Sequence, residues 1–491
     1  MRNVARVDAA LRLRSAQGRW VLLATVLGSS MAMLDSTVVN VALPTIGDDL
    51  DADVGGLQWV VNGYTLALAS LILLGGALGD RWGRRRVFVI GVVWFAVASL
   101  LCGVAPNVET LIAARVLQGV GGALLTPGSL ALISASFDTE DRGAAIGAWS
   151  GLGGVATAIG PLLGGWLIEA VSWRAIFLLN IPLAAVVVWV CGRHVPESRD
   201  PEAPEHFDLL GVALTAGGLA ALTYGLIESS TWLSVVGLVV LLLFVVQERR
   251  SPNPLVPLGL FRDRVFSGAN VVTFVVYGAL GAVFFLLVVQ LQVVAGYSPL
   301  AAGAATLPIT ILMLLFSPAA GRLGTRIGPR VPMTVGPLVG AAGLLLMLRV
   351  GPDASYLADV APGVVVFGIG LTILVSPLTT AVLAAAPDHL AGTASGVNNA
   401  VARTAQLLAV AALPPLVGIV GGALSDPDLF DAGFDQAMLV CAAMMVAGGA
   451  IAWATIRTRP RTHDIPIEQQ AGCDVSAPRP YPATSSHGRP S

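Results

Sequence analysis

The chain of 491 residues is 55% hydrophobic and only 12% charged, and its mean hydropathy is +0.79. Soluble domains carry about a quarter charged residues, so this composition excludes a water-exposed fold for most of the chain. The formal net charge of −2 gives no indication of a nucleic-acid partner.

Apolar stretches follow one another along almost the whole chain, each close to the roughly 20 residues that cross a bilayer core as a helix. Fourteen are predicted, near 20–44, 57–79, 87–105, 110–135, 143–168, 174–192, 208–228, 230–247, 265–291, 300–320, 331–350, 358–385, 393–421 and 434–456. The first could be mistaken for a signal peptide, but it contains Asp35 and leads into further spans, so we expect it to be retained. The predicted fold class is an all-α polytopic membrane protein with 14 transmembrane helices.

The distribution of arginine predicts the orientation in the membrane. Arginines gather in the N-terminal arm and in alternate loops, whereas the opposite loops hold only Arg174 and Arg349. Positive charge favours the cytoplasmic side, and an even number of spans returns the chain to its starting side. We therefore expect both termini in the cytoplasm and the protein in a bacterial cytoplasmic (inner) membrane. The tail, rich in Pro, Ser and His, is expected to be disordered.

One sequence pattern occurs twice. Gly76–Arg85 (GALGDRWGRR) ends the second predicted span, and Gly321–Arg330 (GRLGTRIGPR) ends the tenth. Short cytoplasmic turns need glycine and attract arginine, so convergence is the alternative explanation. The equivalent placement favours duplication, a transporter design in which substrate binds near the midplane between two halves.

The repeat divides the predicted spans into domains. These are a cytoplasmic N-terminal arm (1–19), an N-terminal six-helix bundle (20–192), cytoplasmic linkers with two extra transmembrane helices (193–264), a C-terminal six-helix bundle (265–456) and a cytoplasmic tail (457–491).

Asp35 is the first candidate for a mechanistic role, because it lies well inside the first predicted span. An ionisable side chain in a membrane helix is costly and marks a functional site by default. Burial raises the pKa of carboxyl groups in general, which allows a deep aspartate to bind and release protons. The alternative is an aspartate that caps or packs a helix, and its position inside the span disfavours that interpretation.

Five motifs carry a family resemblance. They are Leu34–Pro44 (LDSTVVNVALP), Gly79–Arg86 (GDRWGRRR), Arg115–Gly122 (RVLQGVGG), Gly160–Gly165 (GPLLGG) and Trp173–Pro182 (WRAIFLLNIP). Together they resemble the fourteen-helix drug:proton antiporter branch of the major facilitator superfamily, over nearly all of residues 20–456. Ala156 departs from the pattern, which usually has glycine there. The resemblance implies two six-helix bundles with a central two-helix insertion.

The resemblance also implies residue roles. Arg115 would link protonation of Asp35 to conformational change, although on physical grounds alone it could be a structural arginine bound by backbone carbonyls. A cytoplasmic gate would comprise Gly79, Asp80, Arg81, Gly83, Arg84 and Arg85, which otherwise form a positive-inside anchor. The antiporter motif, found in exporters, would comprise Gly160, Pro161, Gly164 and Gly165. Its proline kinks the helix and its glycines allow close packing, as in any kinked packing helix.

Polar and aromatic residues on spans that should border the cavity are the candidate substrate contacts, and most could equally join helices to one another. They are Asn40, Asn62, Tyr64, Gln118, Tyr277, Phe284, Phe285, Gln290, Gln292 and Arg403. Arg403 has no counterpart in the first half; it either lines the cavity or pairs with an acid there, and a structural role is equally open. A mostly apolar cavity with few polar anchors suits hydrophobic, chemically varied ligands.

The sequence thus predicts a proton-coupled antiporter, not an enzyme, that exports small hydrophobic drug-like or antibiotic molecules by alternating access. No GxxxxGK[ST] fingerprint occurs, and the cysteines lack metal or redox spacing, so we expect no metal and no cofactor beyond the proton gradient. The expected partners are the small-molecule substrate, protons and lipid, and the chain is expected to be a monomer. The alternatives are a dedicated exporter of one endogenous metabolite and a non-transporting membrane sensor or structural protein.

The second half lacks a matching deep acid. The position equivalent to Asp35 lies among apolar residues near Leu280. We therefore expect poor handling of dications and better handling of neutral, zwitterionic or singly charged compounds.

Overall fold

The computed structural model describes residues 11–201, 207–387 and 390–456. Within these ranges the regular elements are helices, apart from an isolated bridge between Leu11 and Phe137. The described helices belong to one compact unit. Arg2, Arg6, Cys473 and the predicted tail (457–491) lie outside the described residues.

The first bundle contains the helices that precede residue 195. They are α1 (Ala16–Leu50), α2 (Val54–Trp82), α3 (Arg84–Gly103), α4 (Val108–Ser136), α5 (Thr139–Ala170), α6 (Arg174–Leu178) and α7 (Asn180–His194). Polar side chains cap several of them: Ser15, Asp53 and Asn107 accept backbone N–H groups at the starts of α1, α2 and α4. Each cap marks where the chain leaves a loop and enters an apolar span.

The remaining helices form a central hairpin and a second bundle. The hairpin is α8 (Leu209–Ile227) and α9 (Thr231–Arg250), and the second bundle has α10 (Arg264–Val293), α11 (Pro299–Ala305), α12 (Leu307–Ile327), α13 (Arg330–Leu346), α14 (Ala361–Ala384), α15 (Ala391–Leu416) and α16 (Pro427–Thr455). Short turns η1 (Leu258–Arg262), η2 (Met347–Arg349), η3 (Tyr356–Val360) and η5 (Gly421–Ser425) connect some of them. The observed helices follow the predicted stretches closely, and the predicted spans 174–192 and 300–320 are each interrupted, as α6/α7 and α11/α12.

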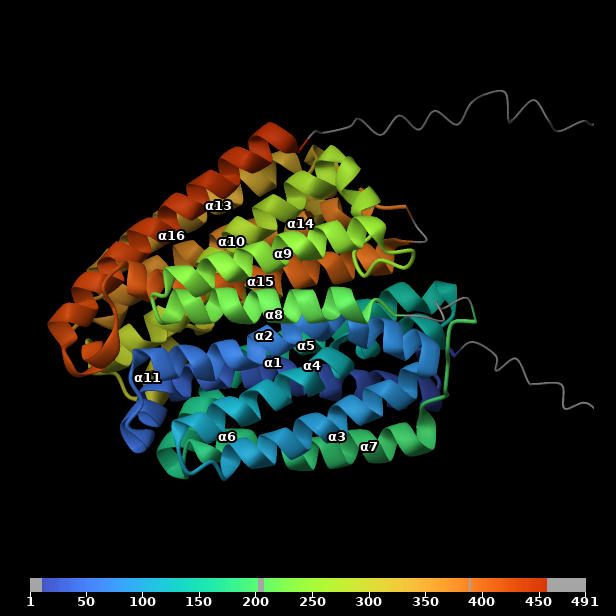
Figure 1. The fold of residues 1–491 in the computed structure, drawn as a ribbon, viewed down its shortest axis with the longest axis horizontal. Coiled ribbons are helices and arrows are strands. Elements are labelled where there is room, and N and C mark those ends of the chain that lie inside the picture. The colour runs from blue at the N-terminus through green and yellow to red at the C-terminus, as the bar shows by residue number, and fades with distance from the viewer. Residues whose placement is uncertain (1–10, 202–206, 388–389, 457–491) are drawn as a thin grey trace, which may run out of the picture. The chain divides into compact units, whose positions relative to one another are not determined.

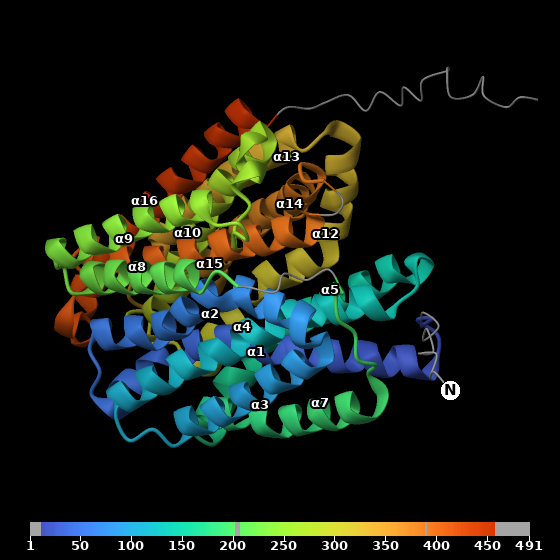
Figure 2. The same ribbon diagram turned by 45° about the vertical axis from the view of Figure 1, so that its right-hand side comes forward.

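The hairpin lies along the boundary between the bundles. Figure 1 shows α8 between the blue helices of the first bundle and the orange helices of the second, where it packs against α2 and α15. Figure 2 keeps α1, α3 and α7 on one side of α8 and α13, α14 and α16 on the other. The fold therefore brings α1, α2 and α5 of one half against α10, α11 and α15 of the other.

Thirteen spans in the described part of the chain are long and apolar enough to cross a membrane, one fewer than predicted. The difference is α15, which corresponds to the predicted stretch 393–421. It is 26 residues long, but Asn398, Asn399, Arg403 and Gln406 make it less apolar than the others. Because α15 packs against α2, α8 and α10, these polar groups are accommodated inside a membrane bundle.

Glycine allows close helix packing at related places in both bundles. A Cβ atom at Gly75 of α2 would overlap the backbone of Ala123 on α4, and one at Gly370 of α14 would overlap the backbone of Gly340 on α13. Membrane helices use small residues in this way to approach one another. These contacts hold each bundle together around the site described next.

Candidate functional site

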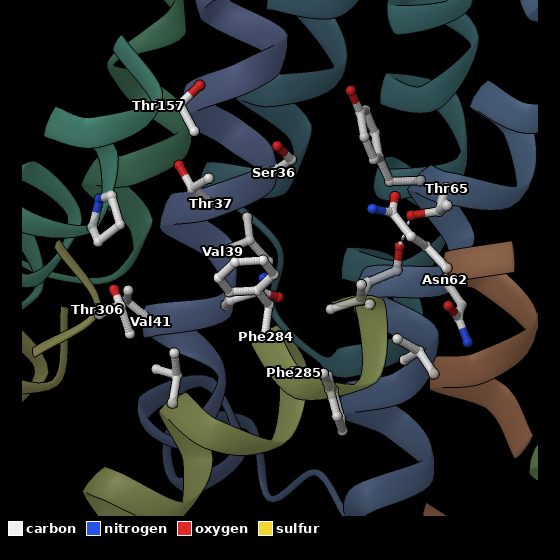
Figure 3. Close-up of a pocket in the computed structure, with 18 of the residues that line it drawn as sticks. Ser36, Thr37, Val39, Val41, Asn62, Thr65, Thr157, Phe284, Phe285 and Thr306 are labelled. Atoms are coloured by element: carbon white, nitrogen blue, oxygen red, sulfur yellow. Dashed lines mark hydrogen bonds between the residues drawn. The ribbon is translucent and has the colours of Figure 1, made fainter. Parts of the chain in front are cut away.

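A cavity of about 240 Å³ lies between the two bundles. α1, α2, α4 and α5 line it from one side and α10, α12 and α15 from the other. The lining residues are Ser36, Thr37, Val39, Asn40, Val41, Val61, Asn62, Tyr64, Thr65, Arg115, Thr157, Pro161, Gly281, Phe284, Phe285, Val288, Thr306, Thr310, Arg403, Gln406 and Val410. Figure 3 shows Phe284 facing the α1 residues Thr37 and Val39, with Asn62 and Thr65 on the opposite side of the view.

Asp35 and Arg115 form a buried ion pair beside this cavity. The Nη1 atom of Arg115 lies 2.6 Å from Oδ2 of Asp35, and each side chain is only 1% exposed. Arg115 is part of the cavity lining, whereas Asp35 is not. The arginine therefore stands between the carboxylate and the cavity.

A hydrogen-bond network holds the pair in place. Gln118 donates from Nε2 to Oδ1 of Asp35 (2.7 Å) and to the hydroxyl of Ser99 (2.7 Å), and its Oε1 accepts from Arg115 (2.6 Å). Asn180 of α7 donates to the same hydroxyl. The network ties α1, α3, α4 and α7 together, and its members satisfy one another in a low-dielectric setting where an unpaired charge is costly.

Arg115 has further partners that stabilise its charge. Its Nε donates to the carbonyl of Val60 (3.1 Å). Its guanidinium carbon lies 4.4 Å from the centre of the Tyr64 ring and 5.8 Å from that of Phe177, within cation–π range. The arginine would therefore keep partners if Asp35 became neutral.

The second bundle contributes Arg403, from α15. It is half-buried in the cavity wall, and its Nη1 donates to Oε1 of Gln406 at 3.5 Å. In the described part of the chain no carboxylate lies within 4.0 Å of its guanidinium nitrogens. Of the two alternatives in the sequence analysis, the structure supports a place in the cavity wall rather than pairing with an acid.

Six of the ten candidate substrate residues line the cavity: Asn40, Asn62, Tyr64, Phe284, Phe285 and Arg403. The other four do not. Gln118 is engaged with Asp35, Tyr277 packs against the apolar core, Gln290 donates to the carbonyl of Val350 and to Asp431, and Gln292 donates to the carbonyl of Val41. Spans alone do not say which way a side chain points, and long amides reach neighbouring backbones.

The hydroxyl residues of the cavity were not anticipated from sequence. They are Ser36, Thr37, Thr65, Thr157, Thr306 and Thr310. Ser and Thr in helices often bond to a carbonyl three or four residues back, as Thr37, Thr65 and Thr157 do here. Nothing in the sequence separates such a residue in a cavity wall from one that faces lipid.

The antiporter motif lies where α5 meets both bundles. There is no room for a side chain at Gly160, which faces Thr37, or at Gly164, which faces Val38 on α1. Gly165 packs on the backbone of Leu300, at the start of α11. Pro161 lines the cavity and has Gly303 of α11 against its backbone. The motif is therefore a packing element between the two halves.

The predicted gate residues lie at the C-terminal end of α2 and the start of α3. Arg84, the first residue of α3, donates to Oδ1 of Asp80, in the last turn of α2, at 2.9 Å. Gly83 has a φ of +110°, and a side chain there would meet Glu197. Glu197 accepts the backbone N–H groups of Arg85 and Arg86. Glu197 was missed in the sequence, because it lies in the unstructured segment after α7, far from the motif.

The ends of the cavity differ. Beyond the cavity, on the side predicted to be extracellular, Gln58 donates to the carbonyl of Val410 (2.6 Å), Gln292 to that of Val41 (3.0 Å), and Leu300 N–H to Glu169 (2.8 Å). All three bonds join the first bundle to the second. At the opposite end of α5, a Cβ atom at Gly143 or Gly147 would have open space around it. The halves are thus joined on the predicted outer side.

Metal-ligating side chains do not gather in this site. Among the described residues, no group of three or more His, Cys, Asp or Glu is placed to hold a metal ion. Cys102, Cys191 and Cys441 are free and buried.

Comparison with known proteins places this geometry in context. The sequence profile of the Major Facilitator Superfamily matches residues 25–410. A tetracenomycin C resistance and export protein of Streptomyces glaucescens is 36% identical, over 81% of this chain and 75% of its own. A puromycin resistance protein of Streptomyces alboniger is 34% identical over 91% and 92%, and a multidrug resistance protein of Mycobacterium tuberculosis is 39% identical over 77% and 72%.

Solved structures share the fold at low sequence identity. A bacterial homologue of the human lysosomal transporter Spinster superposes with a TM-score of 0.66 at 17% identity, covering 90% of this chain and 97% of that one. A peptide transporter in complex with sulfate gives a TM-score of 0.66 at 16% identity, covering 92% and 98%. Both likenesses show a shared fold.

Proposed function

The chain belongs to the major facilitator superfamily, and from this premise we propose that it is a proton-coupled antiporter that exports small, largely apolar molecules by alternating access. The observation that carries the proposal is the buried pair of Asp35 and Arg115 directly beside the cavity between the bundles. The matched relatives are resistance and export proteins, which supports outward transport.

Proton coupling runs through Arg115, because it contacts both the carboxylate and the cavity. When Asp35 is ionised, the ion pair holds α1 and α4 together. A proton on Asp35 removes one charge of the pair and frees Arg115 to shift toward the carbonyl of Val60, Gln118 and the Tyr64 ring. A ligand in the cavity meets a different wall in each state, so proton and ligand affinity are linked reciprocally.

The transport cycle exchanges one cargo for the other. The inward-facing cavity binds substrate from the cytoplasm while Asp35 releases its proton there. The outward-facing cavity releases substrate, and Asp35 takes up a proton from outside. The hydrogen bonds that join the bundles on the outer side fit an inward-facing conformation. The pairing of Asp80, at the end of α2, with Arg84, at the start of α3, fits it as well. In the outward-facing state Asp80 would instead brace a neighbouring helix end.

The proposed location is the bacterial cytoplasmic membrane, with both termini in the cytoplasm. Its support is the arginine distribution, with Arg174 and Arg349 alone on the outer loops. Multi-pass membrane insertion itself follows from the thirteen apolar spans and from the family.

Transport into proteoliposomes tests the function. Three probes share one ring and differ in charge: 2-naphthalenesulfonate (anion), 2-naphthalenesulfonamide (neutral) and (2-naphthylmethyl)trimethylammonium (cation). Vesicles with an acidic interior and a potential clamped by potassium and valinomycin should accumulate at least one of them, and dissipating the pH gradient should abolish accumulation. Asp35→Asn should reduce it to the level of empty vesicles, whereas Asp48→Asn, at an exposed position of the same helix, should behave as wild type.

Two results would overturn the proposal. Accumulation that is the same with and without the pH gradient would show that transport is not coupled to protons. Gradient-driven accumulation that persists in Asp35→Asn would remove Asp35 from the mechanism. A membrane sensor or structural protein would accumulate none of the probes in any variant.

A further inference from the structure

The charged side chains that line the cavity are both arginines in the described part of the chain, Arg115 and Arg403. Asp35, the nearest acid, is 1% exposed and bound by Arg115 and Gln118. A ligand in the cavity therefore meets positive charge and no exposed carboxylate. This arrangement is unfavourable for a cation and favourable for an anion.

Arg403 is a cation with no carboxylate within 4.0 Å among the described residues. It donates to the neutral amide of Gln406 over a long distance of 3.5 Å. Charged side chains in membrane helices usually pair with an opposite charge, as Arg115 does with Asp35. The missing partner at Arg403 can be supplied by a ligand, and its planar fork of N–H donors fits an anionic oxygen pair.

Asn62 is an independent sign of a ligand in the same cavity. Its side chain is 0% exposed and lines the cavity, yet neither Oδ1 nor Nδ2 has a hydrogen-bond partner in the structure. Buried amides are nearly always satisfied. An amide left with a free donor and a free acceptor in a cavity wall is ready to bind a polar group of a ligand.

The rest of the wall is suited to an aromatic ring. Phe284 and Phe285 of α10 and Tyr64 of α2 contribute rings, and Val39, Val61 and Val288 contribute aliphatic surface. In Figure 3 the Phe284 ring lies beside Val39 of α1, and Phe285 extends from the next position of α10 in a different direction. Stacking and apolar burial on these residues favour a flat, hydrophobic ligand.

We propose that the preferred cargo is an aromatic monoanion, whose acidic group binds Arg403 and Asn62 while its ring packs against Phe284 and Phe285. This proposal rests on the proposed function, because it names the class of substrate for the same cavity. It sharpens the expectation of poor dication handling. It also predicts discrimination against monocations, which the sequence alone did not.

Equilibrium binding to the purified protein tests the proposal without any proton gradient. The sulfonate and the sulfonamide probes have nearly the same shape and differ in charge. Wild-type protein should bind the sulfonate at least about tenfold more tightly than the sulfonamide, as expected for a charge-assisted contact of 1.4 kcal/mol or more. The trimethylammonium probe should bind most weakly.

Variants locate the source of the preference. Arg403→Gln should bring the sulfonate down to the sulfonamide's affinity and leave sulfonamide binding within about twofold, and Arg403→Lys should keep part of the preference. Asn62→Ala should weaken both probes, because both carry sulfonyl oxygens, and should leave their ratio unchanged. Arg349→Gln, which removes an arginine 57% exposed on the predicted outer side, is the matched control and should bind as wild type.

Each contrary result has a definite reading. Equal sulfonate and sulfonamide binding in wild type, tighter binding of the cation, or a preference that survives in Arg403→Gln would overturn the proposal and leave Arg403 a hydrated structural residue. None of these would touch the proposed function if the vesicles still accumulate a probe in an Asp35-dependent manner. Conversely, the sulfonate preference with no gradient-driven accumulation would support the site and overturn the antiport.

Discussion

The two walls of the cavity differ in whether their arginine is paired with an acid. On the side of the first bundle, Arg115 is bound to Asp35, Gln118 and the Val60 carbonyl. On the side of the second bundle, Arg403 has a single long hydrogen bond to Gln406. In the first wall the charges of Arg115 and Asp35 neutralise each other. In the second wall the charge of Arg403 is available to a ligand that enters the cavity. This division of roles separates the proton site from the proposed ligand site.

The difference matches the divergence of the two halves. Near the position equivalent to Asp35, the second half has Leu280, which is buried. Its neighbour Gly281 lets α10 approach α15 closely, at Gln406. Where the first half has an acid, the second half has an apolar helix contact, so Arg403 on α15 has no counter-charge at that position.

The largest expected effect comes from removing the acid of the first wall. Asp35→Asn keeps the shape and abolishes the protonatable group, so gradient-driven transport should fall at least about 100-fold, to background. Ligand binding should weaken but persist, because the variant resembles the protonated state, which competes with ligand, while the residues that line the cavity are unchanged. Affinity measured beside transport would check this. If binding and transport were lost together, the separation of the two walls would be wrong.

Removing Arg115, the positively charged member of the same pair, should affect folding more than ligand binding. Arg115→Leu leaves a buried carboxylate without its partner, which costs about 3–5 kcal/mol, and should lower the thermal melting temperature in detergent strongly. The double variant with Asp35→Asn should melt closer to wild type than Arg115→Leu does. A double variant that melts lower than Arg115→Leu would contradict the account of a self-satisfied wall.

The packing of α5 on the first wall gives a smaller expected effect. Gly164→Val places a side chain where Val38 of α1 lies, and overpacking of this kind costs about 1–3 kcal/mol. Transport should fall as well, because α5 also contacts α11 of the second bundle. Gly217→Val on α8, where a Cβ meets nothing within 4 Å, is the control. Equal melting temperatures for the two variants would argue against tight packing at Gly164.

The smallest expected effect lies outside the cavity, in the central hairpin. Burial alone would raise the pKa of Asp208, but hydrogen bonds from Gly211 N–H, Ser251 and Gln247 outweigh it and hold the pKa below its usual value. Its stabilising contribution is therefore present at neutral pH and lost as the pH falls through that lowered pKa.

Asp208→Asn tests this contribution. The variant keeps the cap but loses the charge, and because hydrogen bonds to a charged acceptor are stronger than those to a neutral one, it should cost about 1 kcal/mol. Melting measured from pH 7 downward should show the difference from wild type shrinking. The cavity should bind its probes as before. A constant difference at all pH values would show that charge plays no part.

Much of the fold followed from the sequence, because a membrane imposes length and polarity on every span. Most helix ends were predicted to within four residues and all of them to within seven, and the family resemblance is confirmed. α15 was predicted as a helix and is one, but it is not apolar enough to count as a span, because Asn398, Asn399, Arg403 and Gln406 lower its hydropathy. These polar residues lie on a helix that packs against α2, α8 and α10 inside the protein. A criterion that expects every span to be as apolar as lipid does not anticipate them.

The site was predictable only where a residue is unusual for its surroundings. Asp35 and Arg115 stand out in apolar spans, and they do meet, 2.6 Å apart. Gln118 was placed among the substrate contacts, but it holds Asp35 instead, because the rotation of a helix is set by packing and not by composition. The role of the pair in proton transfer stays a prediction.

Proton release tests the central claim most directly. Purified wild-type protein in a lightly buffered solution with a pH indicator should release protons when a saturating probe is added, because ligand and proton compete through Arg115. Asp48→Asn should release the same amount, and Asp35→Asn should release none while still binding the probe. Undiminished release from Asp35→Asn would show that the proton resides elsewhere, and the coupling assigned to the first wall would be wrong.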